Sequence, residues 1–330
     1  MSVPRPSRRQ ALTWGGAAVT AAGAAAAWRS VFTGEPRPGG DLTLSTGVPS
    51  GVYARYGRLL QSQLARDLPE VRMRLTASEG SVQNIERLLA GEADFTIATA
   101  DSLAAHQAAG GEGSDRMRAC ARLYDDYLHL VVPRDSAVRG ARDLGGLLVG
   151  VGQDQSGVQL VTRELLAAAG LDMDKDVSPV REGINAMPRM LEAGRLDGFF
   201  WSGGLPTSAV RQLSQRAQIR LVPLGELLQP LRARGPHTAY YRAAVMPPDA
   251  YPEIAGGQVI DTLAVANLLV TTVDADAALT EQITRSVING RDRIGRQVHA
   301  AQRVDLRTAI YTQPLELHPG AGAYYRSVKS

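Results

Sequence analysis

The sequence predicts an α/β protein folded into two lobes with a ligand cleft between them. A chain of 330 residues is long for a single core and fits two lobes. The succession of an apolar strand, a turn rich in glycine and serine, and an amphipathic helix occurs near the N-terminus and again past the midpoint. In open α/β sheets, ligands bind beyond the carboxyl ends of the strands, so these turns are the candidate binding elements.

The first such unit contains the turn at 45–53. An alternating apolar run before it predicts a strand, and an amphipathic pattern at 56–64 predicts a helix after it. Gly47 and Gly51 allow the backbone to approach a ligand, and Ser50 can cap the helix or donate a hydrogen bond. The first N–H groups of a helix lack intrahelical partners and favour negative charge. The turn therefore predicts a carboxylate or phosphate site, although an ordinary turn without a ligand explains the same residues.

Later strands follow the same scheme. The predicted strands cover 71–76, 95–98, 119–132, 147–152, 197–202, 219–222 and 263–272. The turns after them include Gly80-Ser81, Gln155–Val158 and Trp201–Gly203, and two helices are predicted at about 276–289 and 294–302. Turns of this kind that face each other across two lobes would hold a small anion.

A glycine pair in the middle of the chain suggests a nucleotide cofactor at first sight. Gly150 and Gly152 match the start of the dinucleotide fingerprint, but Gln155 occupies the position of its third glycine. The fingerprint fails, and no other motif calls for a cofactor. The five histidines are scattered and no paired Cys/His spacing occurs, so no metal site is predicted.

The charge balance argues against nucleic-acid binding. The formal net charge of +3 arises from Arg5, Arg8 and Arg9, which lie in a 28-residue stretch without acidic residues. No basic stripe with interleaved aromatic residues appears elsewhere. The single cysteine, Cys120, lies between two alanines ahead of an apolar segment, which favours a buried structural residue over a nucleophile.

The N-terminus predicts export from the cytoplasm. Residues 1–28 combine a basic head, including Ser7-Arg8-Arg9, with a run rich in alanine and glycine, and resemble a twin-arginine signal. We expect cleavage near Ala26 and an extracytoplasmic location, with an uncleaved signal that tethers the protein to the membrane as the alternative. Residues 29–40 are then a linker rich in glycine and proline.

Several short motifs appear in the order found in one family. They are Gly47-x-x-x-Gly51-x-Tyr53, Ser78-x-Gly80-Ser81-x-x-Asn84, Gly91–Asp94, Ser156-Gly157, Gly170-Leu171, Ala193–Gly198 and Leu317–Ala321 with Tyr324-Tyr325. Together they cover about residues 42 to 325. With these motifs the chain resembles the TAXI-type solute receptors of the tripartite ATP-independent periplasmic (TRAP) transporters.

The resemblance implies a type II periplasmic-binding-protein fold, with residues 41–132 plus 259–330 in lobe I and 133–258 in lobe II. It also implies a monomeric receptor that binds a small carboxylate, such as glutamate or 2-oxoglutarate. Such a receptor delivers its ligand to a membrane permease driven by an ion gradient, and it is not an enzyme.

The resemblance further implies a set of ligand-binding residues. These are Gly47, Ser50, Gly51, Tyr53, Gly80, Ser81 and Asp101 on one lobe and Gln155, Ser156, Gly157, Val158, Trp201, Ser202 and Gly203 on the other. Backbone N–H groups at Ser81 and Val158 would hold carboxylate oxygens, and Tyr53 would supply a hydroxyl and an apolar wall. Trp201 fits core packing equally well.

Two departures from the family pattern affect the expected ligand. Val48 and Val158 stand where the family often has hydroxyl side chains, and a less polar acid fits that change.

Two other functions stay open. One is a ligand-sensing accessory of a membrane histidine kinase, and the other is an enzyme that uses Cys120, as in the similarly two-lobed hydroxymethylbilane synthase.

Overall fold

The computed structural model describes residues 39–255, 258–298, 300–301 and 305–329. The strands of this part form one sheet in the order β2-β1-β3-β10-β4-β7-β5-β6, with β8 on β4 and β9 on β10. They are β1 (Gly40–Ser45), β2 (Val71–Thr76), β3 (Phe95–Thr99), β4 (Met117–Pro133), β5 (Leu148–Gly150), β6 (Ser178–Val180), β7 (Gly198–Gly203), β8 (Ile219–Leu221), β9 (Arg242–Met246) and β10 (Ile260–Thr272).

Helices connect and cover these strands. The α-helices are α2 (Val52–Asp67), α3 (Ser81–Leu89), α4 (Ala100–Ala108), α5 (Gly157–Ala168), α6 (Met187–Glu192), α7 (Ser208–Ser214), α8 (Leu228–Arg232), α9 (Pro252–Ala255), α10 (Ala277–Gln297), α11 (Leu306–Ala309) and α12 (Pro319–Ser327). Short 3-10 turns are η1 (Ser114–Arg116), η2 (Ala141–Leu144), η3 (Gly225–Leu227), η4 (Pro236–Thr238) and η5 (Pro248–Ala250).

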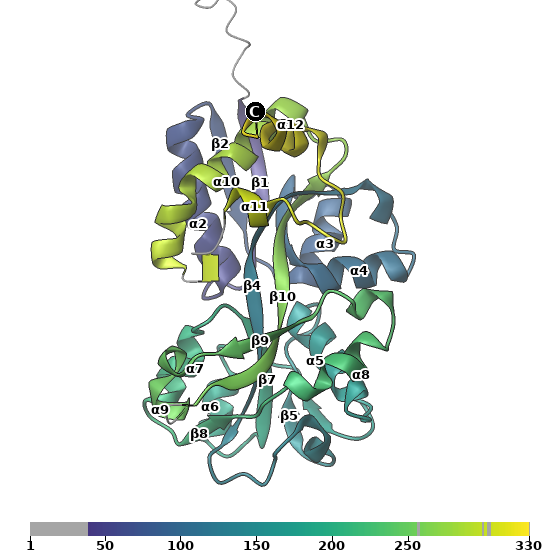
Figure 1. The fold of residues 1–330 in the computed structure, drawn as a ribbon, viewed down its shortest axis with the longest axis vertical. Helices are drawn as coiled ribbons and strands as arrows, with labels where there is room; N and C mark the ends of the chain where they lie inside the picture. Colours follow the sequence, from purple (N-terminus) through teal and green to yellow (C-terminus); the bar gives the residue numbers. More distant parts are fainter. Residues whose placement is uncertain (1–38, 256–257, 299, 302–304, 330) are drawn as a thin grey trace, which may run out of the picture. The chain divides into compact units, whose positions relative to one another are not determined.

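The sheet consists of two parallel parts joined by an antiparallel pair. Strands β1, β2 and β3 run parallel to one another, as do β5, β6 and β7. Between them β4 and β10 pair antiparallel with each other and with their outer neighbours β7 and β3. In Figure 1 β4 and β10 run along the centre, with β1, β2, α2, α3, α4, α10 and α12 at one end and β5, β7 and α5 to α9 at the other. The predicted two-lobed α/β fold is confirmed.

Each lobe has its own apolar core. In the first lobe Leu60 and Leu64 of α2, spaced by one helical turn, are fully buried against the sheet. In the second lobe Leu165 of α5 and Phe200 of β7 belong to a separate buried cluster. Burying each large apolar side chain contributes roughly 1.5–3 kcal/mol, so each lobe is stabilised around its own part of the sheet.

The strands exchange partners within their length. β4 pairs with β10 as far as Tyr127 and with β7 from Tyr127 to Val131, while β10 pairs with β9 from Ile260 to Ala264. Two continuous strands therefore run through both lobes. The division at 132/133 and 258/259 stays a prediction of how the chain separates into lobes.

One prediction of secondary structure is wrong. The two helices expected at about 276–289 and 294–302 are a single helix, α10, which ends at Gln297. Gly290 lies inside it, and a Cβ there would come within 3.0 Å of Cγ of Gln63 on α2. The glycine lets the two helices approach closely, so packing outweighs its low helix propensity.

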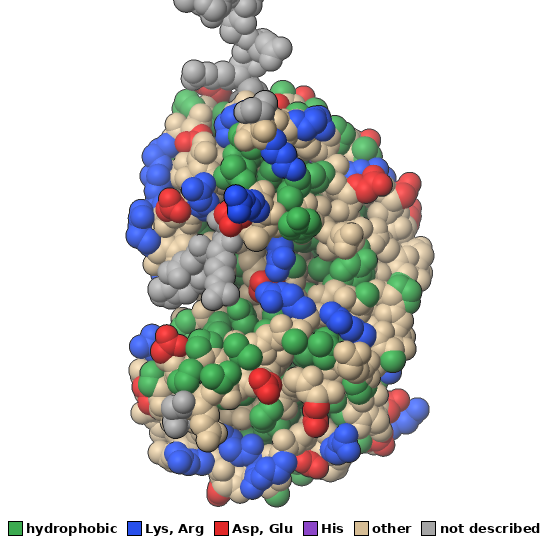
Figure 2. Space-filling view, viewed as in Figure 1, with side chains coloured by type: hydrophobic (Ala, Val, Ile, Leu, Met, Phe, Trp, Pro, Cys, Tyr) green, Lys and Arg blue, Asp and Glu red, His purple; other side chains and the backbone are tan. Residues whose placement is uncertain are grey.

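The predicted export signal at 1–28 and residues 29–38 of the predicted linker lie outside the described residues. None of the described helices is both long and apolar enough to cross a membrane. On the described part of the face in Figure 2, basic and acidic side chains are interspersed rather than gathered by sign.

Candidate ligand-binding site

A pocket lies between the two lobes, beside the carboxyl ends of strands from both. The space inside it measures about 650 Å³ with its open mouth included. Eleven of the fourteen residues expected at the site line it: Gly47, Gly51, Tyr53, Gly80, Ser81, Ser156, Gly157, Val158, Trp201, Ser202 and Gly203. Turns far apart in the sequence thus meet around one cavity, and their role in binding stays a proposal.

Four helices begin at this pocket. Helices α2, α3, α4 and α5 start directly after Gly51, Gly80, Thr99 and Ser156, and all four of these residues line the cavity. The Ser156 hydroxyl accepts a hydrogen bond from the Gln159 N–H at 3.1 Å and so caps α5. Because each helix start carries unused N–H groups and partial positive charge, the cavity favours an anionic group.

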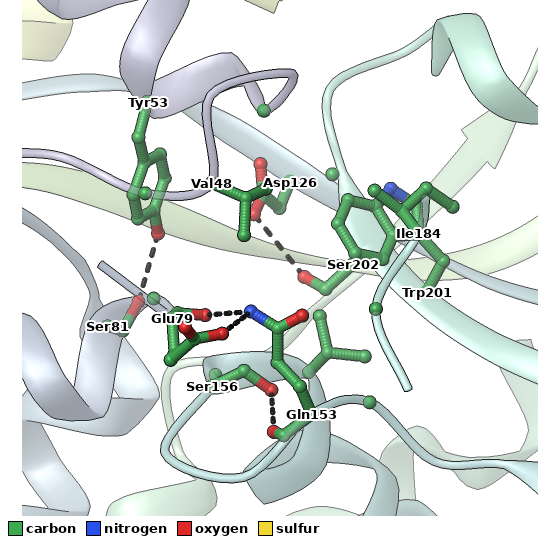
Figure 3. Close-up of a pocket in the computed structure, with 18 of the residues that line it drawn as sticks. Val48, Tyr53, Glu79, Ser81, Asp126, Gln153, Ser156, Ile184, Trp201 and Ser202 are labelled. Atoms are coloured by element: carbon green, nitrogen blue, oxygen red, sulfur yellow. Dashed lines mark hydrogen bonds between the residues drawn. The ribbon is translucent and has the colours of Figure 1, made fainter. Parts of the chain in front are cut away.

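The lobes touch at the rim of the pocket. Gln153 Nε2 donates to a carboxylate oxygen of Glu79 at 2.5 Å and to its backbone oxygen at 3.0 Å (Figure 3). Gly80 has a φ of +138°, and a Cβ there would lie 3.3 Å from Cα of Ser156. A Cβ on Gly157 would lie 3.2 Å from the Ser81 oxygen. The positive φ of Gly80 favours glycine there, and at both positions an added side chain would press against the facing residues.

A chain of hydrogen bonds forms the inner wall. The Tyr53 hydroxyl donates to Asn267 Oδ1 at 2.5 Å and shares a hydrogen bond with the Ser81 hydroxyl at 3.0 Å. The Ser81 oxygen also accepts the Thr99 N–H at 3.2 Å. Burial raises the pKa of Tyr53 well above its ordinary value, so the phenol stays protonated and can act as a donor.

Asp126 of β4 is the buried acid of the pocket. Its side chain is 5% exposed, and one of its oxygens receives a long hydrogen bond of 3.4 Å from Ser202. Figure 3 shows Asp126 and Ser202 facing each other on the wall opposite Ser156. Burial raises the pKa of Asp126 to about 7, with smaller contributions from the nearby charges of Asp101 and Asp125.

Apolar side chains cover much of the remaining wall. Val48, Val52, Val158 and Ile184 line the cavity, together with the ring of Trp201. The indole N–H donates to the Thr207 hydroxyl at 3.2 Å, which fixes the ring at the end of β7. Trp201 therefore lies at the cavity as well as packing against its own lobe.

Three of the expected residues do not line the pocket. Ser50 is exposed and donates to Asn185 Oδ1 at 2.6 Å. Asp101 is buried behind the start of α4, where it accepts hydrogen bonds from the Tyr241 hydroxyl and the Ser102 N–H. Gln155 has a φ of +61°, and its amide points away to contact Gln83 and Glu86. All three have partners elsewhere in the protein.

Seven lining residues besides Val48 and Val52 were not expected at the site: Glu79, Thr99, Asp126, Gly152, Gln153, Gly183 and Ile184. Most of them are neighbours of expected turn residues, and a wider window around each turn would have included them. Gly183 and Ile184 follow β6, away from these turns, and Asp126 lies inside the long strand at 117–133. A carboxylate within a run of buried strand residues was the available signal.

Cys120, the residue on which an enzymatic function would depend, lies away from the pocket. Cys120 is fully buried in the first lobe, outside the pocket lining, and burial raises the pKa of its thiol to about 12. The prediction that Cys120 is a buried structural residue is confirmed. Its thiol does not line the cavity, so the enzyme that the sequence left open could not use Cys120 on a ligand bound there. Among the described residues no group of three or more His, Cys, Asp or Glu side chains could hold a metal ion.

The mixed α/β fold with two lobes is similar to that of several solved structures, among them proteins described as transporters. A solved structure of a periplasmic transporter matches with a TM-score of 0.56 and 12% identity, over 89% of this chain and 94% of the other. A Bordetella bronchiseptica protein matches with a TM-score of 0.53 and 17% identity, over 84% and 83%. A Listeria monocytogenes protein described as a candidate L-cystine ABC transporter matches with 0.50 and 12%, over 79% and 97%.

The sequence itself identifies the family. The NMT1-like family matches residues 44–328, which is most of the chain. The protein belongs to the NMT1-like family.

Proposed function

We propose that the protein is an extracytoplasmic receptor that captures a small carboxylate between its lobes and delivers it to a TRAP permease in the membrane. The observation that carries this proposal is the convergence of the starts of α2, α3, α4 and α5 on one interlobe pocket. Backbone N–H groups at Ser81 and Val158 are the proposed donors to the carboxylate. The motifs shared with TAXI-type receptors support the choice of permease.

The apolar wall supports an acid whose remaining part is not strongly polar. Val48 and Val158 line the cavity in place of the hydroxyls expected from the TAXI resemblance. A second polar group on the ligand would lose its water beside these valines without gaining a partner, at a cost of about 1–3 kcal/mol. We therefore rank acids with short or apolar side chains above dicarboxylates.

A thermal-melt screen of the full chain by circular dichroism tests the binding role. Amino acids, keto acids and dicarboxylates are added one at a time, and a ligand at a hundredfold excess over its Kd adds about 2.7 kcal/mol of stability. We expect at least one acid to raise the melting temperature. If none does, the carboxylate receptor is the wrong function for this pocket.

A matched pair of glycine variants tests the location of the site. Gly157→Val places a side chain against Ser81 and Ser102 and should abolish the shift given by the bound acid. Gly145→Val is the control, because Gly145 is exposed and its nearest other atom, on Leu171, is 4.0 Å from the added Cβ position. Equal shifts of the melting temperature in both variants would show that the ligand does not bind in the interlobe pocket.

Transport measurements test the permease. Membrane vesicles prepared from the source cells are supplied with the receptor and labelled ligand. A TRAP system takes up the ligand with an ion gradient and no ATP. Uptake that requires ATP would show that the partner is an ATP-driven transporter and not a TRAP permease. The receptor function would still stand.

A further inference from the structure

Asp126 is buried without the partners that a buried carboxylate normally has. Its side chain is 5% exposed, and its Oδ1 atom has no hydrogen-bond partner among the described residues. The other oxygen has only the 3.4 Å contact from Ser202. The amide of Asn267 lies near enough to lower the pKa of Asp126, yet its Nδ2 atom also lacks a hydrogen-bond partner. Buried polar atoms of this kind normally have hydrogen-bond partners, so this part of the pocket wall lacks hydrogen bonds that a ligand could supply.

Among the described residues that line the pocket, no positive charge compensates Asp126. None of the described residues that line the cavity is an arginine, lysine or histidine. The two arginines nearby in the sheet, Arg122 and Arg242, both pair with Asp125, the neighbouring residue on the opposite face of β4. An ionised and unpaired carboxylate in a buried wall costs several kcal/mol. A partner from outside the chain would remove that cost.

We propose that the ligand supplies this partner as a protonated amine that donates to Asp126, so that Asp126 selects amines over the matching keto acids. The inference rests on the proposed receptor function and adds a second polar contact to it. The carboxylate of the ligand lies at the helix starts, and the ammonium group reaches the opposite wall at Asp126. A keto acid offers only an acceptor at that position, which would face the carboxylate unfavourably.

The protonation of Asp126 makes this selection depend on pH. The groups that interact electrostatically or by hydrogen bonds with Asp126 include no cation: Tyr53, Asp101, Tyr124, Asp125, Ser202 and Asn267. With a pKa of about 7, Asp126 is neutral in mildly acidic solution and ionised above neutrality. The ammonium group of a ligand binds the ionised form of Asp126. Because an aliphatic amine keeps its proton across this pH range, only Asp126 titrates. Amine binding therefore strengthens as the pH rises to 7 and levels off above it.

Calorimetric titration of the full chain with matched sets of ligands tests the inference. One set is leucine, its keto acid and isoamylamine, another is alanine, pyruvate and ethylamine, and a third pairs glutamate with 2-oxoglutarate. At pH 8 we expect the amino acid of at least one set to bind about ten- to a hundredfold more tightly than its keto acid. From pH 7 down to pH 5 the amino-acid affinity should fall by about tenfold per pH unit.

Two variants separate the role of Asp126 from general damage. Asp126→Asn keeps the size of the side chain and should abolish both the preference for the amino acid and the pH dependence, while keto-acid binding stays or improves. Asp125→Asn is the matched control, because Asp125 pairs with arginines outside the pocket lining, and it should keep the preference. Circular dichroism spectra confirm that both variants are folded.

The outcomes distinguish this inference from the receptor function. Keto acids that bind as tightly as amino acids, or a preference that survives in Asp126→Asn, would overturn the inference and leave the carboxylate receptor standing. If the simple amines bind and none of the acids does, the role of Asp126 as the ammonium-binding residue is supported and the proposed carboxylate site is wrong. If no ligand of either kind binds, both proposals are wrong.

Discussion

Asp101 and Asp126 are both buried acids close to the pocket, and their surroundings differ. Asp101, 2% exposed at the start of α4, accepts hydrogen bonds from the Tyr241 hydroxyl and from the Ser102 N–H at 2.8 Å. Asp126 has the single long contact from Ser202 and an oxygen without a partner. Burial raises the pKa of both, and hydrogen bonds oppose the shift at both: four act at Asp101, whereas only Asn267 and Ser202 act at Asp126. A carboxylate that the protein satisfies stabilises the fold, whereas an unsatisfied one beside a cavity is available to a ligand.

The largest expected effect of this contrast is on the pH dependence of stability. The pKa of Asp126 is about 7 in the folded protein and about 4 in an unfolded chain, so the folded state holds the extra proton between these values. The unfolding free energy of the wild type should therefore fall with rising pH, by about 2.3 kcal/mol from this residue between pH 5 and pH 7. Asp126→Asn should lack that fall and be the more stable protein at pH 8.

Urea denaturation of the two proteins between pH 5 and pH 8 measures this difference. Asp125→Asn serves as the control and should keep most of the fall seen in the wild type, because the charge of Asp125 makes only a smaller contribution to the pKa of Asp126. Parallel curves for the wild type and Asp126→Asn would show that Asp126 is satisfied in solution, and the contrast between the two acids would disappear.

A smaller effect is expected at the satisfied acid. Asp101→Ala leaves the buried Tyr241 hydroxyl and the Ser102 N–H without their acceptor, and should lower the unfolding free energy by about 2 kcal/mol. Asp135→Ala, at an exposed position, should change it by less than about 0.5 kcal/mol. The measurement is urea denaturation at pH 7. Equal losses in the two variants would contradict the structural role of Asp101.

The smallest expected effect concerns the hydrogen-bonded chain that holds Asn267 near Asp126. Tyr53→Phe removes the donor to Asn267 and the contact with Ser81, and should cost about 1 kcal/mol of stability. Tyr311→Phe is a suitable control, because the Tyr311 side chain is 69% exposed. We expect the pKa of Asp126, followed through the pH dependence of stability, to change when the Asn267 amide is released. An unchanged pKa of Asp126 would show that the Asn267 amide does not influence the Asp126 carboxyl group.

The sequence was sufficient for the fold class because the relevant signals are local. The alternation at 71–76 and the glycine-serine turns at 47–51, 80–81 and 156–157 each fix a strand, a turn or a helix start. Those turns also supplied most of the pocket lining, since a turn after a parallel strand lies at the ligand-binding edge whatever its partners are.

The remaining parts of the site depend on contacts between distant segments. Whether Asp101 or Asp126 faces the cavity is decided by Tyr241 and by the pairing of β4 with β10 and β7, and no local pattern contains that information. Helix α10 was divided in the prediction for the same reason. The packing of Gly290 on Gln63, more than two hundred residues away, keeps the helix continuous.

The position of Trp201 has a practical consequence. The chain has three tryptophans, and the other two, Trp14 and Trp28, precede residue 39, so Trp201 is the single indole of residues 39–330. It lies on the pocket wall, hydrogen-bonded through its ring nitrogen. Its fluorescence should change when a ligand displaces water from the cavity. The protein thus carries its own optical probe of occupancy, and ligands can be screened without a label.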